Sequence, residues 1–229
     1  LGERCLADDA CGARWDGGSW NTVGTGINNF PNERVRALAA VGGDSYAGGN
    51  FITAGGVQVN RIARWDGVTW GRVGTGTGSS IGIGGEVAAL AVIGGDLYVG
   101  GAFLAAGGLA AARIARWSGS TWSSLGTGNG NGVGSNVTAL TAIGNDLYVG
   151  GLFTTAGNAT ANHVARWDGG TWSSLGAGIG NGVNGAVLAM AAIGSDLYVA
   201  GTFDQAGGAA ALRVARGDGA ACCFAPARA

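Results

Sequence analysis

Residues 137–176 read VTALTAIGNDLYVGGLFTTAGNATANHVARWDGGTWSSLG, and most of the chain repeats this stretch with small changes. The tyrosine of the repeat recurs at intervals of 52, 50 and 50 residues, and the first of its two tryptophans recurs at intervals of 50, 52 and 50 residues. A period of about 50 residues is typical of repeat architectures in which each unit is one small supersecondary element. The residues that carry this period are Tyr46, Tyr98, Tyr148 and Tyr198, together with Trp15, Trp65, Trp117 and Trp167.

Each unit contains four segments with the pattern of β-strands. In the unit at 87–126, an apolar segment is followed by a Gly-Gly pair, which is the kind of two-residue turn that closes a tight hairpin. The segments DLYVGG, RIARW and TWSSLG then follow in order. The spacing of three and four residues that marks an amphipathic helix is absent. The sequence therefore predicts an all-β fold of four propeller-like units, each with four antiparallel strands.

The units are expected to form a single repeat domain that covers 1–229, because no change in composition marks a linker. The first and last parts of the chain are incomplete copies of the unit, and Gly217 occupies the tryptophan position in the last one. The predicted parts are an N-terminal arm at 1–12, a half-unit at 13–24, whole units at 35–74, 87–126 and 137–176, a partial unit at 187–219 and a C-terminal tail at 220–229.

The unit resembles one blade of a kelch-type β-propeller. The resemblance rests on the apolar strand that ends in a glycine pair at 97–101, on the aromatic-Asp-Gly turn at 167–169 and on Trp172. It covers nearly the whole chain and implies blades arranged around an axis. The same kind of unit is similar to repeats of long secreted bacterial proteins, which implies a role in surface architecture.

Charge and hydropathy exclude two classes of partner. The chain has 13 basic and 14 acidic residues and a formal net charge of −1, so it lacks the basic face with which proteins neutralise nucleic-acid phosphates. No apolar run reaches the roughly 18 residues that span a bilayer as a helix. We therefore expect neither nucleic acid nor a membrane span, and nothing in the sequence calls for a cofactor.

The four cysteines lie only near the two ends of the sequence. Cys5 and Cys11 precede the repeats, and Cys222 and Cys223 follow them. This placement predicts disulfides in an oxidising compartment, and hence a secreted or cell-surface protein. The sequence begins without a Met and shows no signal peptide, so we expect a processed mature form. A zinc site is disfavoured, because adjacent cysteines do not give the usual ligand spacing.

The two incomplete units complement each other. The half-unit at 13–24 supplies a third and a fourth strand, and the partial unit at 187–219 lacks its fourth. The N-terminal strands can complete the last unit of the same chain and close a ring, or complete the last unit of a second copy and extend a fibre. The residues expected at this contact are Arg14, Trp15, Trp20, Arg213 and Arg216.

The polar repeat positions favour structure over catalysis. His163 is the only histidine and occupies the position that carries arginine in the other units, so no Ser-His-Asp set can be assembled. One aspartate and one arginine recur in each unit and are expected to form ion pairs, with a ring of cation-binding carboxylates as the alternative. These positions are Asp44, Asp96, Asp146 and Asp196 with Arg64, Arg116, Arg166 and Arg216.

The tryptophans allow two interpretations. They are expected to pack one unit against the next, although aromatic side chains can also stack on sugars. The sequence thus predicts a non-catalytic secreted protein that joins to copies of itself in a fibre or surface layer through strand sharing and terminal disulfides. The alternative is a closed four-bladed monomer that binds a glycan or a protein ligand on its loop face.

Overall fold

The structure, a computed structural model, describes residues 11–27, 33–74, 82–176, 181–217 and 225–226. These residues are all-β, and the one helical turn among them is the 3-10 segment η2 (Gly128–Gly130). The predicted pattern of repeated four-stranded antiparallel sheets is confirmed.

Each unit forms one such sheet, with the first strand of the unit at one edge and the fourth at the other. Unit 1 contains β3 (Val35–Val41), β4 (Asp44–Gly49), β7 (Ile62–Trp65) and β8 (Trp70–Arg72). Unit 2 contains β9 (Glu86–Ile93), β10 (Asp96–Ala102), β13 (Ile114–Trp117) and β14 (Trp122–Ser124). Unit 3 contains β15 (Val137–Ile143), β16 (Asp146–Gly151), β19 (Val164–Trp167) and β20 (Trp172–Ser174). Unit 4 contains β21 (Val187–Ile193), β22 (Asp196–Gly201), β25 (Val214–Gly217) and β26 (Ala225–Pro226).

The predicted loop between the second and third strands contains a short hairpin in every unit, which the sequence analysis did not anticipate. These hairpins have strands of only two residues, too short to show an alternating pattern. They are β5 (Thr53–Ala54) with β6 (Val57–Gln58), β11 (Ala105–Ala106) with β12 (Leu109–Ala110), β17 (Thr155–Ala156) with β18 (Ala159–Thr160), and β23 (Gln205–Ala206) with β24 (Ala209–Ala210).

The two ends of the chain require corrections. The N-terminal half-unit is a hairpin of β1 (Cys11–Trp15) and β2 (Trp20–Ile27), so residues 11–12 belong to a strand and not to a strandless arm. At the other end, β26 from the tail pairs with β25 and takes the fourth place in unit 4. In this structure, therefore, the last sheet is not completed by the N-terminal hairpin of the same chain.

The turn between the first two strands of unit 2 follows from its glycine pair. Between β9 and β10, Gly94 and Gly95 have φ values of +59° and +90°. Two consecutive positive φ values are what a type I′ turn requires, and its twist matches that of antiparallel strands. The turn fixes the register, and it sets Leu97 opposite Val92 and Val99 opposite Leu90. Because side chains alternate along a strand, Leu97 and Val99 lie on one face of the sheet and Tyr98 lies on the other.

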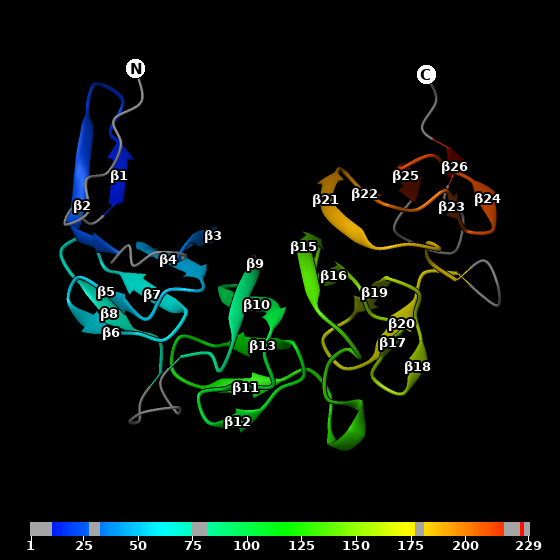
Figure 1. The fold of residues 1–229 in the computed structure, drawn as a ribbon, viewed down its shortest axis with the longest axis horizontal. Coiled ribbons are helices and arrows are strands. Elements are labelled where there is room, and N and C mark those ends of the chain that lie inside the picture. Colours follow the sequence, from blue (N-terminus) through cyan, green and yellow to red (C-terminus); the bar gives the residue numbers. More distant parts are fainter. Residues whose placement is uncertain (1–10, 28–32, 75–81, 177–180, 218–224, 227–229) are drawn as a thin grey trace.

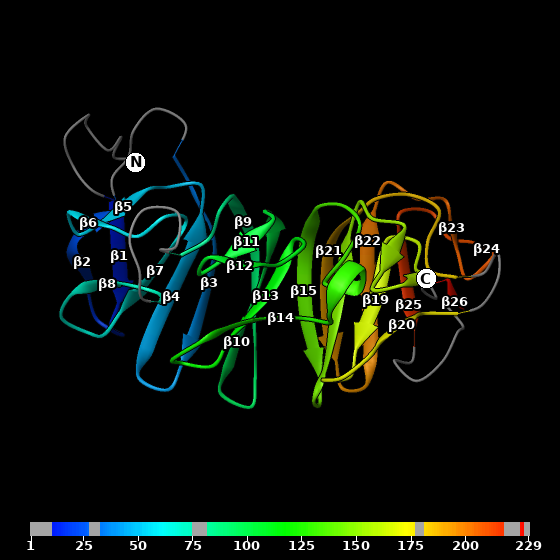
Figure 2. The same ribbon diagram turned by 90° about the horizontal axis from the view of Figure 1, so that it is seen from below.

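The four units follow one another along an open arc (Figure 1). The first strands, β3, β9, β15 and β21, lie on its concave side, and neighbouring first strands contact each other. The β1–β2 hairpin lies at one end of the arc and unit 4 lies at the other. Seen from below, the sheets of successive units lie side by side along the arc (Figure 2).

The apolar core lies between the units. We call the face of a unit that meets the preceding unit its N-facing side and the opposite face its C-facing side. Tyr46 and Ile62 on the C-facing side of unit 1 pack in one cluster with Leu97, Val99 and Trp117 on the N-facing side of unit 2. The same pairing of faces recurs between units 2 and 3 and between units 3 and 4. Each unit thus buries its apolar surface only by packing against its neighbours.

Candidate assembly surfaces

A valine of one unit packs against a glycine of the preceding unit at each internal junction. Val137 on the first strand of unit 3 lies over Gly100 of unit 2, where an added Cβ would come within 2.5 Å of its Cγ1. Val187 lies over Gly150 in the same way, at 2.6 Å. Contacts between carbon atoms are most favourable at about 3.5 to 4 Å, so these sites have no room for a methyl group. Val87 approaches Gly48 equally closely at the first junction.

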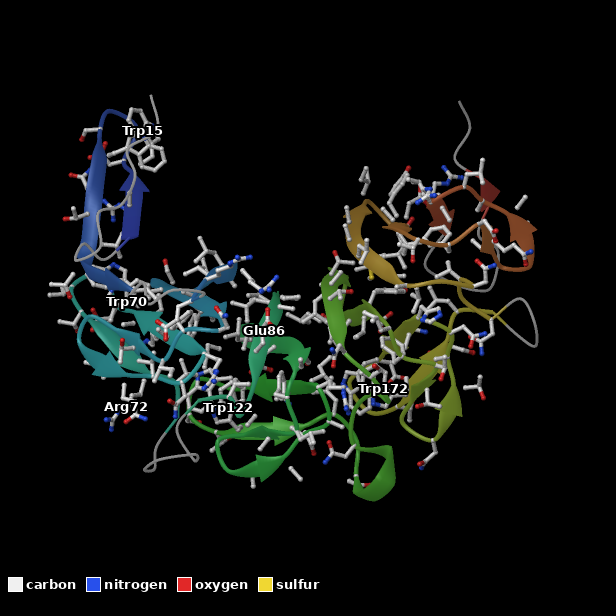
Figure 3. The ribbon with its side chains drawn as sticks, viewed as in Figure 1. Trp15, Trp70, Arg72, Glu86, Trp122 and Trp172 are labelled. Atoms are coloured by element: carbon white, nitrogen blue, oxygen red, sulfur yellow. The ribbon has the colours of Figure 1, made fainter. Side chains whose placement is uncertain are left out.

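The second tryptophan of a unit reaches into the preceding one. Trp122 Nε1 donates a hydrogen bond of 3.1 Å to the carbonyl oxygen of Val73 in unit 1, and Trp172 Nε1 donates one of 2.9 Å to Leu125 in unit 2. Figure 3 shows these tryptophans at the junctions between units. Trp117 and Trp167 are buried beside them, with ring centroids 5.2 Å from those of their partners.

The N-terminal hairpin sits against unit 1 as the outer strands of a preceding unit would. Trp70 Nε1 donates a 3.0 Å hydrogen bond to the carbonyl oxygen of Val23, as its counterparts do at the internal junctions. Ile27 pairs with Ala54, and the same bridge recurs as Ile83 to Ala106 between units 1 and 2. The hairpin is therefore the outer half of one further unit whose inner half is missing among the described residues.

The surface that this inner half would cover is apolar and exposed. Val35 and Leu38 lie on the N-facing side of β3 and are 41% and 73% exposed. The counterparts of Val35 at the internal junctions, Val87, Val137 and Val187, are buried, and those of Leu38 are half-buried and pack against the core clusters. We call Val35 and Leu38 the N-terminal end surface.

The opposite end of the arc exposes the complementary face. On the C-facing side of unit 4, Ile193 is 65% exposed, whereas the equivalent Ile93 and Ile143 pack in the clusters between units. An apolar depression of about 150 Å³ lies on this face, at the place where Val187 and Met190 of the next unit fill the C-facing side of unit 3. We call the exposed face the C-terminal end surface; it consists of Ala189, Ala191, Ile193, Tyr198 and Ala200.

Within the described ranges, the outer strands of unit 4 lack contacts that the outer strands of units 1 to 3 make. Leu197 is paired with Gly217, whereas Leu97 and Leu147 are each paired with a tryptophan. The ion pair between Arg216 and Asp196 measures 3.4 Å, against 2.5 to 2.7 Å in the other units. The β1–β2 hairpin carries the tryptophan pair that unit 4 lacks.

Trp15 and Trp20 lie opposite each other in the hairpin, with ring centroids 5.6 Å apart. Both side chains are more than half exposed, and Figure 3 shows Trp15 on the β1–β2 hairpin. Arg14 lies beside Trp15 in β1, at the position of Arg216 in β25. Arg213 lies just before β25 and is exposed. The predicted contact residues thus lie at opposite ends of the arc.

The repeated charges pair within their own units. Arg64, Arg116 and Arg166 each bind the aspartate at the start of the second strand of the same sheet, and the hydrogen bond that Arg64 donates to Asp44 raises the pKa of Arg64. Among the described residues, no group of three or more acidic, histidine or cysteine side chains could hold a metal ion. The aspartate and arginine that recur in each unit thus form ion pairs within one sheet, as the sequence predicted.

His163 lies at a strained backbone position common to all units. Its φ is +64°, and the residues at the same place in the other units, Arg61, Arg113 and Arg213, have φ values of +65° to +68°. Burial lowers the pKa of His163. Its Nδ1 is buried without a hydrogen-bond partner in the described part of the chain, and its backbone N–H donates to the carbonyl oxygen of Phe153 at 2.8 Å.

The cysteines are only partly covered by the structure. Cys11 begins β1, and Cys5, Cys222 and Cys223 lie outside the described residues.

A second concave feature lies at the outer rim of unit 3. This open depression of about 380 Å³ is lined by Trp167, Trp172, Asn158 and Thr171, with glycines from the connection before unit 3. Aromatic faces with amide and hydroxyl groups suit a sugar. Trp172 Nε1, however, is already bonded to Leu125.

No protein-family model and no curated protein matches the chain. Among solved structures, it matches the computationally designed protein Ika8 with 16% sequence identity and a TM-score of 0.38, over 83% of this chain and 60% of the designed one. The chain therefore spans less than two thirds of that protein. No helix in the described ranges is long and apolar enough to cross a membrane.

Sequence reasoning missed the residues of the two end surfaces. Val35, Leu38 and Ile193 fit the repeat consensus, so nothing in their identity separates them from buried counterparts. One signal was present, because Ala200 replaces the first glycine of the pair that the three preceding units keep.

Proposed function

We propose that this chain is a non-catalytic structural protein of the kelch-like propeller type, secreted or held at the cell surface, whose copies join head to tail. The observation that carries the proposal is the complementarity of the two ends. The internal junctions pair the C-facing side of one unit with the N-facing side of the next, and the arc exposes one of these faces at each end.

The joint is formed by strand sharing. The β1–β2 hairpin of a second copy takes the place of β25 and β26 beside β22, because both hairpins hold the same position in the repeat. The exchange sets Trp15 opposite Leu197 in place of Gly217, and Arg14 next to Asp196 in place of Arg216. Val35 and Leu38 of the second copy then cover the C-terminal end surface.

Burial of these side chains favours the exchange. Trp15, Val35 and Leu38 lose water-exposed apolar surface, and each fully buried large apolar side chain contributes about 1.5 to 3 kcal/mol. A head-to-tail contact is heterologous, so it propagates into a fibre unless the geometry closes it into a ring. We further propose that disulfides between the terminal cysteines lock this joint covalently.

Sedimentation velocity over a range of protein concentrations, with and without reductant, tests the proposal. The wild type should form species larger than a dimer as concentration rises, and negative-stain images should show linear or ring-shaped particles. Leu38→Asp should remain monomeric, because a charge cannot be buried in the apolar joint. Val68→Asp is the matched control, since Val68 is equally exposed but lies in the hairpin between β7 and β8.

A wild type that stays a compact monomer at all concentrations contradicts assembly. Such a monomer, if it also binds a glycan or a protein, would support the closed four-bladed alternative, and the depression beside Trp172 is where that ligand would be sought.

A further inference from the structure

One residue of the C-terminal end surface departs from the rule that holds at every internal junction. The first residue of the glycine pair is Gly48, Gly100 and Gly150 in units 1 to 3 and Ala200 in unit 4. At the three glycines, an added Cβ would collide with the valine of the next unit. Ala200 carries this Cβ.

The residue that a second copy brings to this place is Val35, the counterpart of Val87, Val137 and Val187. Valine is branched at Cβ, which restricts its side-chain rotamers, so it cannot swing aside as a long side chain can. Its Cγ1 would meet the Ala200 methyl at the distance that excludes a methyl elsewhere in the chain. The second copy must therefore sit farther from unit 4 than one internal unit sits from the next.

We propose that Ala200 loosens the joint between copies and makes it reversible, while the internal junctions stay permanently closed. The occupant of the C-terminal end surface is a second copy of this chain, so the inference rests on the proposed function. The steric cost is of the kind seen when a methyl group is forced into a packed core, which corresponds to a loss of about tenfold in affinity.

The test measures the dissociation constant of the self-association by sedimentation for a series at this one position. Ala200→Gly should bind about tenfold more tightly than the wild type, because the methyl that holds Val35 away is removed. Ala200→Val should bind more weakly than the wild type, because it adds two further methyl groups to the same place.

Ala189→Gly is the matched control. Ala189 lies directly opposite Ala200 on the same exposed face, and the corresponding residues of the other units are also alanines. Both substitutions carry the same backbone cost of glycine in a strand, but only Ala200→Gly removes the obstructing methyl. Thermal unfolding of the dilute proteins checks that all variants are folded.

The outcomes separate the two claims. Tighter association of Ala200→Gly than of the wild type, with Ala189→Gly at or below wild-type affinity, supports the inference. If the wild type associates and Ala200→Gly has the same affinity, the inference about Ala200 is wrong, whereas the proposal of head-to-tail assembly is not contradicted. If neither protein associates at any concentration, both proposals fail.

Discussion

At the scale of single residues, one glycine in each unit sets the distance to the next sheet. Gly100 gives Val137 and Leu140 of unit 3 direct contact with the backbone of β10. Glycine in a strand costs backbone entropy, and here that cost is offset by close packing between units. The glycine is required by its neighbour across the junction and not by its own φ.

We predict that Gly100→Ala destabilises the folded chain by about 1 to 3 kcal/mol, because the new Cβ would lie 2.5 Å from Val137 Cγ1 in a packed junction. Urea unfolding followed by tryptophan fluorescence measures the change. Gly43→Ala is the control, since a Cβ at Gly43 meets nothing within 4 Å. Equal stability of the two variants would show that the junction is looser than the structure has it.

A second residue-scale feature is the aspartate that closes the hairpin of the third and fourth strands. Asp168 Oδ1 accepts hydrogen bonds from the backbone N–H groups of Thr171 at 2.7 Å and Gly170 at 2.9 Å. These bonds lower the pKa of Asp168 from 3.8 to about 2, with Thr171 as the larger cause. Asp16 has the same arrangement, and bonds from Ser19 and Gly18 lower its pKa to about 2.

The sign of the pH dependence follows from these values. A carboxylate with a depressed pKa stabilises the fold above pH 3.8, and the contribution is lost as the pH falls through about 2. We predict that the melting temperature of Asp168→Ser, which copies Ser118 of unit 2, lies below that of the wild type at pH 5. The difference should shrink towards pH 2. A difference independent of pH would exclude the carboxylate as its cause.

At the scale of elements, the hairpin of the third and fourth strands is the part that connects units. It carries the tryptophan pair, and the second tryptophan bonds to the backbone of the preceding unit. The β1–β2 hairpin has the same pair with no sheet to receive Trp15. The hairpin that joins neighbouring units inside the chain therefore has an exposed counterpart, the β1–β2 hairpin, at one end of the arc.

We predict that Trp122→Phe destabilises the fold by about 1 to 3 kcal/mol, because the carbonyl oxygen of Val73 loses its indole donor and the ring is smaller. Trp20→Phe should change the stability of the dilute monomer by less than about 0.5 kcal/mol, since Trp20 is exposed. Chemical unfolding of both variants measures the two changes in the free energy of unfolding. A similar decrease in both would mean that the β1–β2 hairpin is already buried in the monomer.

Much of the element order could be predicted from the sequence, because hairpin turns and strand alternation are local. The glycine pair at 94–95 and the segment at 96–101 gave a turn and a strand that the structure contains. The two-residue strands such as β11 and β12 could not be found, since their pairing depends on contacts with neighbouring units and not on a sequence period.

The exposure of the two end surfaces could not be predicted from the sequence either. Leu38 and Leu90 have the same identity and the same repeat position, yet Leu38 is exposed and Leu90 packs in a core cluster. What separates them is whether a complete sheet precedes their unit, which is a property of the assembled arc. The same holds for β26, whose pairing with β25 involves no repeat motif.

At the scale of the whole molecule, the arc is directional. Its N-terminal end surface and C-terminal end surface differ, and the proposed head-to-tail contact between copies uses one of each. Blocking either end of every copy should therefore stop assembly, whereas two differently blocked copies still offer one good end each.

Mass photometry of two blocked variants tests this most directly. Leu38→Asp blocks the N-terminal end surface and Ile193→Asp blocks the C-terminal one, and both side chains are largely exposed in the monomer. We predict that each variant alone is monomeric and that an equal mixture forms dimers and nothing larger. A mixture that stays monomeric while the wild type assembles, or a single variant that assembles alone, would contradict head-to-tail joining.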